Sequence, residues 1–180
     1  MSECGPDCTH EDMPKRYAPD EMPDKIGVDI PPPPNKVTVA RTSMEIINEK
    51  PPIWDLAKEH FAFNPDATFF TWGNKLFNPA KIDPVPMDII KHEEVHAAQQ
   101  NHNEEGAKVW WARYMQEPLF RVDQEARAFG VQYKYLCTVN KDRNAQARIL
   151  HAIACLLSGP TYGNAISHSA ARDFIKQYSK

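Results

Sequence analysis

The distribution of proline constrains the fold of this chain more than any other feature. Half of the 16 prolines lie within the first 34 residues, and they end in the run Pro31–Pro34. Consecutive prolines enforce a stiff polyproline II segment and cannot start a sheet. We therefore predict an extended arm over residues 1–35, which lies over the domain or binds a docking partner. The 145 residues that follow, 36–180, are enough for one domain with a hydrophobic core.

The folded part shows strand patterns first and helix patterns afterwards. Residues 36–41 alternate and are β-branched, which predicts a short strand, whereas residues 43–49 are ambiguous. A helix is expected from Pro51-Pro52 to Phe61, because proline suits the first turn of a helix. Residues 67–77 predict two short strands around the turn Gly73-Asn74. Helical spacing then predicts further helices over residues 86–102, 104–117, 119–139, 143–157 and 167–178. The predicted class is α+β.

Bulk properties exclude several kinds of partner. The net charge of −3 gives no electrostatic case for nucleic acid or an anionic membrane as the main partner. No apolar run approaches the roughly 20 residues that span a bilayer. The N-terminal segment is polar and lacks the apolar region of a secretory signal, so we expect a cytoplasmic location, or a virion if the chain is phage-encoded.

The four cysteines fall into two groups. Cys137 and Cys155 lie in apolar helical segments, where buried free thiols are expected. Cys4, Cys8 and His10 have a spacing that could contribute to a metal site, but three ligands in a tail are incomplete. A flexible tail, or a Cys4–Cys8 disulfide outside the cell, is the favoured interpretation of this group.

The segment HEEVH, residues 92–96, carries the strongest chemical signal. Residues i and i+4 share one face of a helix, so His92 and His96 can reach one Zn²⁺ at about 2.0–2.1 Å. Glu93 stands at the edge of that face and can act as general base toward a water on the metal. The segment therefore predicts a metal site with a base beside it.

A catalytic zinc site needs a third protein ligand, and three downstream residues compete for this role. His102 completes the histidine spacing of metzincins, but Gln99 stands where that family has a turning glycine. The helix is therefore expected to continue, which would rotate His102 roughly 80° off the ligand face. Glu125 lies 29 residues after the second histidine, enough chain for a carboxylate to return from another helix. We favour Glu125, followed by His102 and then Asp123.

Supporting residues are less sharply defined. Gln99 shares the ligand face and is a candidate to hydrogen-bond Glu125 or a histidine ring. A developing oxyanion needs a donor, for which Tyr162 in a glycine-rich loop is the best candidate. Other candidates for this donor are His168, Tyr133, Tyr114 and Arg121. The aromatic residues Phe61, Phe63, Trp110 and Trp111 are expected to be packing, and His60 and His151 have no partner pattern.

An aromatic strand at Phe69–Trp72 is a candidate edge for pairing with an extended peptide. Together with the preceding Thr68 and the following Gly73-Asn74, it precedes the HEEVH segment, Gln99-Gln100 and Glu125-Ala126. This combination, over roughly residues 65–135, resembles small gluzincin-like zinc metallopeptidases of bacteria and phages. The resemblance implies a minimal zincin domain with an active-site helix, an edge strand and a supporting helix. It implies the ligands His92, His96 and Glu125 and the base Glu93.

The main hypothesis from the sequence is a zinc metallopeptidase that acts on a peptide or protein substrate. A second hypothesis is a structural or assembly protein in which zinc stabilises the fold without turnover. A third is a zinc amidase that cleaves a non-peptide or cell-wall amide. The residues of the chain do not separate the substrates of the first and third hypotheses.

Overall fold

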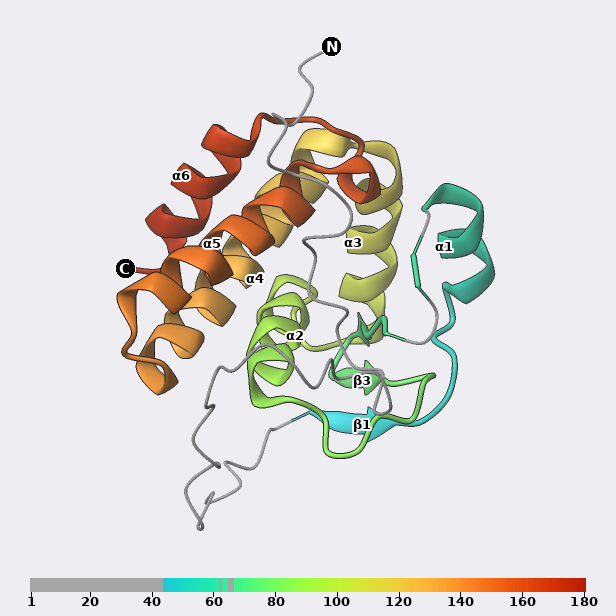
Figure 1. Cartoon of the computed structure of the whole chain (residues 1–180). Coiled ribbons are helices and arrows are strands. Elements are labelled where there is room, and N and C mark those ends of the chain that lie inside the picture. Colours follow the sequence, from blue (N-terminus) through green and yellow to red (C-terminus); the bar gives the residue numbers. More distant parts are fainter. Residues whose placement is uncertain (1–43, 62, 65–66) are drawn as a thin grey trace.

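The computed structural model describes residues 44–61, 63–64 and 67–180 (Figure 1). The predicted arm over 1–35, with Cys4, Cys8 and His10, and the predicted strand over 36–41 lie outside these residues. Within the described part, the chain forms six α-helices and a three-stranded sheet. The α+β class predicted from the sequence is confirmed, and most of the structured residues are helical.

The sheet is small and lies near the start of the described chain. Its strands are β1 (Glu45–Ile47), β2 (Phe70–Trp72) and β3 (Lys75–Phe77), in the order β1-β3-β2. Strands β2 and β3 form the predicted hairpin, and Gly73 takes φ +63°, a backbone conformation that glycine adopts without strain. Strand β1, from the stretch whose pattern was ambiguous, pairs in parallel with β3.

The helices follow the predicted spans within a few residues. They are α1 (Trp54–His60), α2 (Met87–Gln99), α3 (Glu104–Gln116), α4 (Pro118–Val139), α5 (Arg143–Ser158) and α6 (His168–Tyr178), with a short 3-10 helix η2 (Pro160–Tyr162). Asn103, Asp142 and Ser167 cap the N-termini of α3, α5 and α6 through side-chain oxygens that accept backbone N–H groups. Pro118 begins α4, a position where its missing N–H costs nothing.

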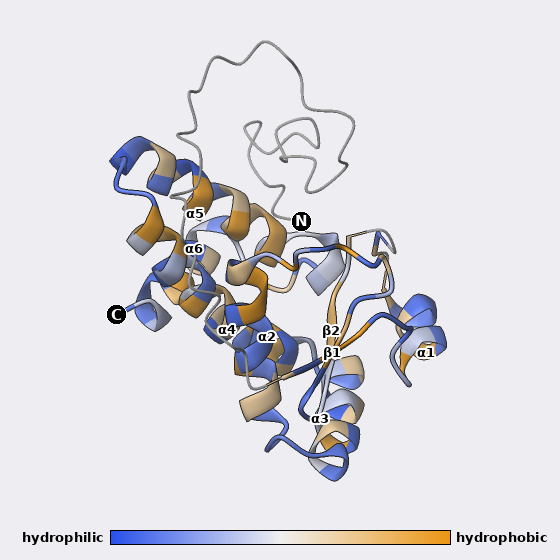
Figure 2. Ribbon diagram, turned by 90° about the horizontal axis from the view of Figure 1, so that it is seen from below, coloured by the Kyte–Doolittle hydropathy of each residue, from blue (hydrophilic) through white to orange (hydrophobic). Residues whose placement is uncertain are grey.

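Helix α4 is the centre of the arrangement, because it packs against α2, α3, α5 and α6. In Figure 1, α4, α5 and α6 lie together, while the sheet and α1 lie on the far side of α2 and α3. Figure 2 shows hydrophilic and hydrophobic residues alternating around α5 and α6, as expected for helices that bury one face.

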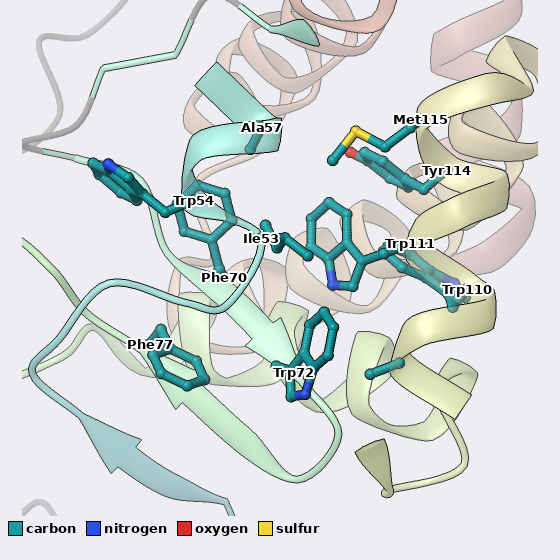
Figure 3. Close-up of a cluster of buried hydrophobic side chains, with 11 residues drawn as sticks. Ile53, Trp54, Ala57, Phe70, Trp72, Phe77, Trp110, Trp111, Tyr114 and Met115 are labelled. Atoms are coloured by element: carbon teal, nitrogen blue, oxygen red, sulfur yellow. The ribbon is translucent and has the colours of Figure 1, made fainter. Parts of the chain in front are cut away.

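The buried hydrophobic residues of the described part form three clusters, of which the two larger differ in composition. The first is aromatic and joins the sheet, α1 and α3 (Figure 3), and Trp54 and Phe70 pack edge to face with ring centroids 5.7 Å apart. The second is mostly aliphatic and joins α4, α5 and α6. Trp110 and Trp111 belong to the first cluster, so their predicted packing role is confirmed.

Close helix contacts depend on small residues. A Cβ at Gly130 of α4 would lie 2.5 Å from the Cβ of Tyr178 of α6, so only glycine permits this approach. Ala126 and Ala128 on the same helix are fully buried, and their small side chains also allow neighbouring helices to approach α4 closely. Among the described residues, no helix is both long and apolar enough to cross a membrane.

Candidate metal centre

Helix α2 brings the two histidines of the HEEVH segment together. His92 and His96 are buried, with 8% and 5% of their surfaces exposed, and their Nε2 atoms lie 3.1 Å apart. Their ring centroids are 4.8 Å apart. The i, i+4 spacing therefore places both imidazoles on one face with the same nitrogen directed to one point.

Helix α4 supplies a carboxylate at that point. Glu125 Oε2 lies 3.5 Å from His92 Nε2, and Glu125 Oε1 lies 3.4 Å from His96 Nε2. Tetrahedral zinc with bonds of about 2.0–2.1 Å separates its ligand atoms by about 3.3 Å. The observed triangle of 3.1, 3.4 and 3.5 Å is close to that spacing, so the donor set and geometry fit a zinc-class ion.

The far nitrogens of both histidines are held by glutamines. His92 Nδ1 lies 3.1 Å from Gln132 Oε1, and His96 Nδ1 lies 2.8 Å from Gln99 Oε1. Because an amide oxygen only accepts, each Nδ1 donates its hydrogen, and a neutral ring in this tautomer would leave its Nε2 lone pair for a metal. The glutamines are themselves fixed, since Gln132 Nε2 donates to Asp88 and Gln99 Nε2 donates to the backbone of Gln124.

The sequence identified Gln99 but missed Gln132. Gln99 was expected to hydrogen-bond either Glu125 or a histidine ring, and its amide oxygen bonds the ring of His96. Gln132 lies seven residues after Glu125, two turns along the same face of α4, and it is fully buried. The signal available in the sequence was a polar residue seven positions, or two helical turns, after the expected ligand.

The electrostatics of the site favour a cation. Burial would raise the pKa of Glu125, but charge on His96 and a hydrogen bond from His92 hold it at about 2. The hydroxyls of Tyr114 and Tyr162 donate to its two oxygens at 2.7 and 3.1 Å. Burial and the adjacent carboxylate raise the pKa of Tyr114 well above its usual value. Glu125 is therefore an ionised carboxylate inside the protein.

Glu93 lies at the same cavity and is anchored to the sheet. Its Oε2 accepts a hydrogen bond of 2.8 Å from the hydroxyl of Thr71 in β2, and its backbone oxygen lies 3.2 Å from the same hydroxyl and shares its single hydrogen. The sequence did not identify Thr71, although a hydroxyl between two aromatic residues in a short strand was a visible signal. Glu93 is 6% exposed, so its carboxylate is oriented by the protein and not by solvent.

A cavity of about 140 Å³ adjoins these groups. Aromatic side chains form much of its wall, from the segment between α1 and β2, from β2, from α3 and from η2. They are Phe61, Phe63, Phe69, Phe70, Trp110, Trp111, Tyr114 and Tyr162. Residues expected only to pack therefore also border the candidate site. His92, Glu93, His96 and Glu125 all line the same cavity.

The candidate oxyanion donors are not all near this cavity. Tyr162 and Tyr114 line it, whereas Tyr133 and His168 do not. Arg121 is buried beside it and donates to the backbone oxygen of Tyr114, while its guanidinium lies over the ring of Phe61. Tyr114 and Tyr162 are the hydroxyls that the fold brings to the site.

The prediction that the helix continues past Gln99 is wrong. Helix α2 ends at Gln99, and Asn101 and His102 have positive φ angles of 55° and 53°. Gln100 stops the helix because its buried amide bonds Gly73 N–H and the carbonyl of Thr71. His102 is exposed and lies outside the cluster of His92, His96 and Glu125. The turn after α2, and not rotation along a continuing helix, therefore excludes it as the third ligand.

The proposed pairing of a peptide with the edge of β2 is restricted by the protein itself. The carbonyl of Thr71 already accepts hydrogen bonds from Gln100 Nε2 at 3.1 Å and from Trp111 Nε1 at 3.0 Å. A peptide strand cannot use this acceptor without displacing at least one of the two donors. Edge pairing at Thr71 is therefore less favourable than the strand pattern alone suggests.

Comparisons of the chain with protein-family models, with curated proteins and with solved structures found no match.

Proposed function

We propose that this protein is a zinc-dependent hydrolase with a minimal zincin-like fold that cleaves peptide bonds. One observation carries the proposal. Two imidazole nitrogens and a carboxylate, from His92, His96 and Glu125, meet at tetrahedral spacing beside a cavity that also contains Glu93. Three protein ligands with a cavity beside them are the arrangement of a catalytic zinc site.

Zn²⁺, when bound, lowers the pKa of a water molecule toward about 7 and polarises a carbonyl. Glu93 takes the proton of the attacking water and passes it to the leaving amine. The hydroxyl of Thr71 holds Oε2 of Glu93, so we assign the proton transfer to Oε1. Thr71 is a positioning residue for this base.

The two tyrosines have different proposed roles. Tyr114 is 7% exposed and stacks on Trp110 with centroids 4.6 Å apart, so it stays in place and orients Glu125. Tyr162 is half-buried in η2 and its longer bond to Glu125 can exchange for a bond to substrate. We assign Tyr162 as the donor that stabilises the developing oxyanion.

The substrate class follows from the cavity wall. Six phenylalanine and tryptophan side chains line the cavity and present apolar and aromatic surface next to Glu93. We propose peptides with an apolar or aromatic side chain next to the cleaved bond. A non-peptide amide with an apolar group would meet the same surface, so both classes belong in the same screen.

Metal analysis and a peptide screen of the full chain test the proposal. His92→Ala, His96→Ala and Glu125→Ala should each bind one zinc fewer than the wild type. Glu93→Gln should keep the zinc content of the wild type and lose hydrolysis. The proposal is wrong if the folded wild type and His92→Ala contain equal zinc, or if Glu93→Gln hydrolyses as fast as the wild type.

A second candidate is a zinc site that stabilises the fold without turnover. The low exposure of the site favours it, since Glu93 and Glu125 are only 6% and 4% exposed. In this case Glu93→Gln would change neither zinc content nor biological function, while His92→Ala would lower the unfolding temperature. A non-peptide amidase would instead cleave amide substrates in the screen and leave peptides intact.

A further inference from the structure

A second cluster of metal-ligand side chains joins α5 and α6. His151 and Cys155 are separated by four residues on α5, and His168 is the first residue of α6. One ligand atom from each of the three lies within 4.8 Å of the others. His151, for which the sequence shows no partner pattern, therefore lies beside two other potential metal ligands. Cys155 is half-buried, not buried as predicted.

The spacing of these atoms suits a tetrahedral metal ion. His151 Nε2 lies 3.6 Å from Cys155 Sγ. Zinc with a Zn–N bond of about 2.05 Å and a Zn–S bond of about 2.3 Å places these ligand atoms about 3.6 Å apart. The ring centroids of His151 and His168 are 4.8 Å apart, the same separation as for His92 and His96. The second cluster thus repeats the packing of the first histidine pair.

An unsatisfied nitrogen is the independent sign that something is held there. His168 Nε2 is buried, and no hydrogen-bond partner for it lies among the described residues. Buried polar atoms in folded proteins nearly always have a partner, because desolvation without one is costly. A metal ion between the rings would give this nitrogen a ligand bond.

We propose that His151, Cys155 and His168 form a second metal site that binds a zinc-class divalent ion. Sulfur and imidazole ligands select borderline and soft metals over Mg²⁺ and Ca²⁺, which prefer oxygen. The three ligands leave a fourth position for water or another ligand. Because the ligands come from two helices, the ion ties the N-terminus of α6 to α5. This site is independent of the proposed hydrolase function.

Cobalt spectroscopy of the full chain separates this site from the first, because only this site has a sulfur ligand. The background protein is Cys4→Ser/Cys8→Ser, which removes the thiols of the arm. After metal is stripped with a chelator, Co²⁺ is added. The expected result is a thiolate-to-cobalt charge-transfer band in the near ultraviolet that an equal amount of Zn²⁺ abolishes. A His₂Glu site cannot produce this band.

Variants assign the band to residues. Cys155→Ser, His151→Ala and His168→Ala should each weaken or remove it, whereas His92→Ala/His96→Ala should keep it. Cys137→Ser is the matched control, since Cys137 is the other half-buried cysteine and lies on α4 outside the cluster. Circular dichroism of each variant checks folding. Absence of the band in the background protein, or an undiminished band in folded Cys155→Ser or His168→Ala, overturns the proposal. A plain thiol–imidazole hydrogen bond would give the first of these results.

Discussion

The two histidine clusters of this protein have the same framework but different support. Each has a pair of residues at i and i+4 on one helix and a third residue from another helix. Around His92 and His96 both far nitrogens are bonded to glutamines, and the carboxylate accepts two tyrosine hydroxyls. Around His151 and His168 the environment is half-exposed, and a buried nitrogen has no hydrogen-bond partner among the described residues.

The side chains of the first cluster are held in a fixed geometry by the protein, whereas the second cluster has a nitrogen that needs a bound ligand to complete its contacts. The first cluster is oriented by hydrogen bonds from α2, α3, α4 and η2, and such fixed geometry suits the catalysis proposed for it. In the second cluster, the proposed ion would supply the contact that His168 Nε2 lacks. We therefore associate the first with chemistry and the second with holding α6 against α5.

The largest expected effect separates the two clusters by activity. Glu93→Gln should lower turnover of a cleaved peptide by about 10²- to 10⁴-fold, because a general base contributes about that much. Cys155→Ser should leave turnover within about twofold, because Cys155 lies outside the cavity. Turnover and zinc content are measured on both variants. Equal losses in both would show that the clusters do not have separate roles.

The next effect separates them by stability. Zinc at 100 times its dissociation constant adds about 2.7 kcal/mol per site, which corresponds to roughly 5–10 °C in the unfolding temperature. Zinc should raise the unfolding temperature of the wild type through both sites. In His92→Ala and in Cys155→Ser it should raise the unfolding temperature through the one site that remains. Calorimetry with and without zinc measures this. A wild-type gain no larger than that of Cys155→Ser argues against the second site.

A smaller effect tests the support of the first cluster. Gln132→Leu removes the acceptor of His92 Nδ1 and should weaken zinc affinity by about 10- to 100-fold without removing the site. Competition with a chelator measures the affinity. Gln177→Leu, at an exposed position of α6, is the matched control and should change nothing. Unchanged affinity in Gln132→Leu would remove the distinction between a supported and an unsupported cluster.

The smallest effect concerns the anchor of the base. Thr71→Val keeps the shape of the side chain and removes the hydrogen bond to Glu93 Oε2. Turnover should fall by about tenfold, equivalent to about 1.4 kcal/mol, because the carboxylate loses one orienting contact. Zinc content should stay the same. A fall in zinc content with unchanged turnover would assign Thr71 to metal binding and not to the base.

Local patterns predicted most of the elements. The Gly73-Asn74 hairpin and the helices appear where turn chemistry and 3.6-residue spacing placed them, since both depend on neighbouring residues. The end of α2 was predicted too late, because Gln100 is held by a strand 27 to 29 residues earlier in the chain. A helix end set by a distant strand has no local signature.

The candidate site, too, has a part that follows from local sequence and a part that depends on tertiary packing. The sequence by itself determined that His92 and His96 share a face with Glu93 beside them, because helix geometry relates residues four apart. It also made Glu125 the favoured third ligand. Only the tertiary structure brought Glu125, Gln132 and Thr71 to that face, and only the packing of α6 on α5 brought His168 to Cys155. These contacts join residues far apart in the chain, and their distances depend on how whole helices pack.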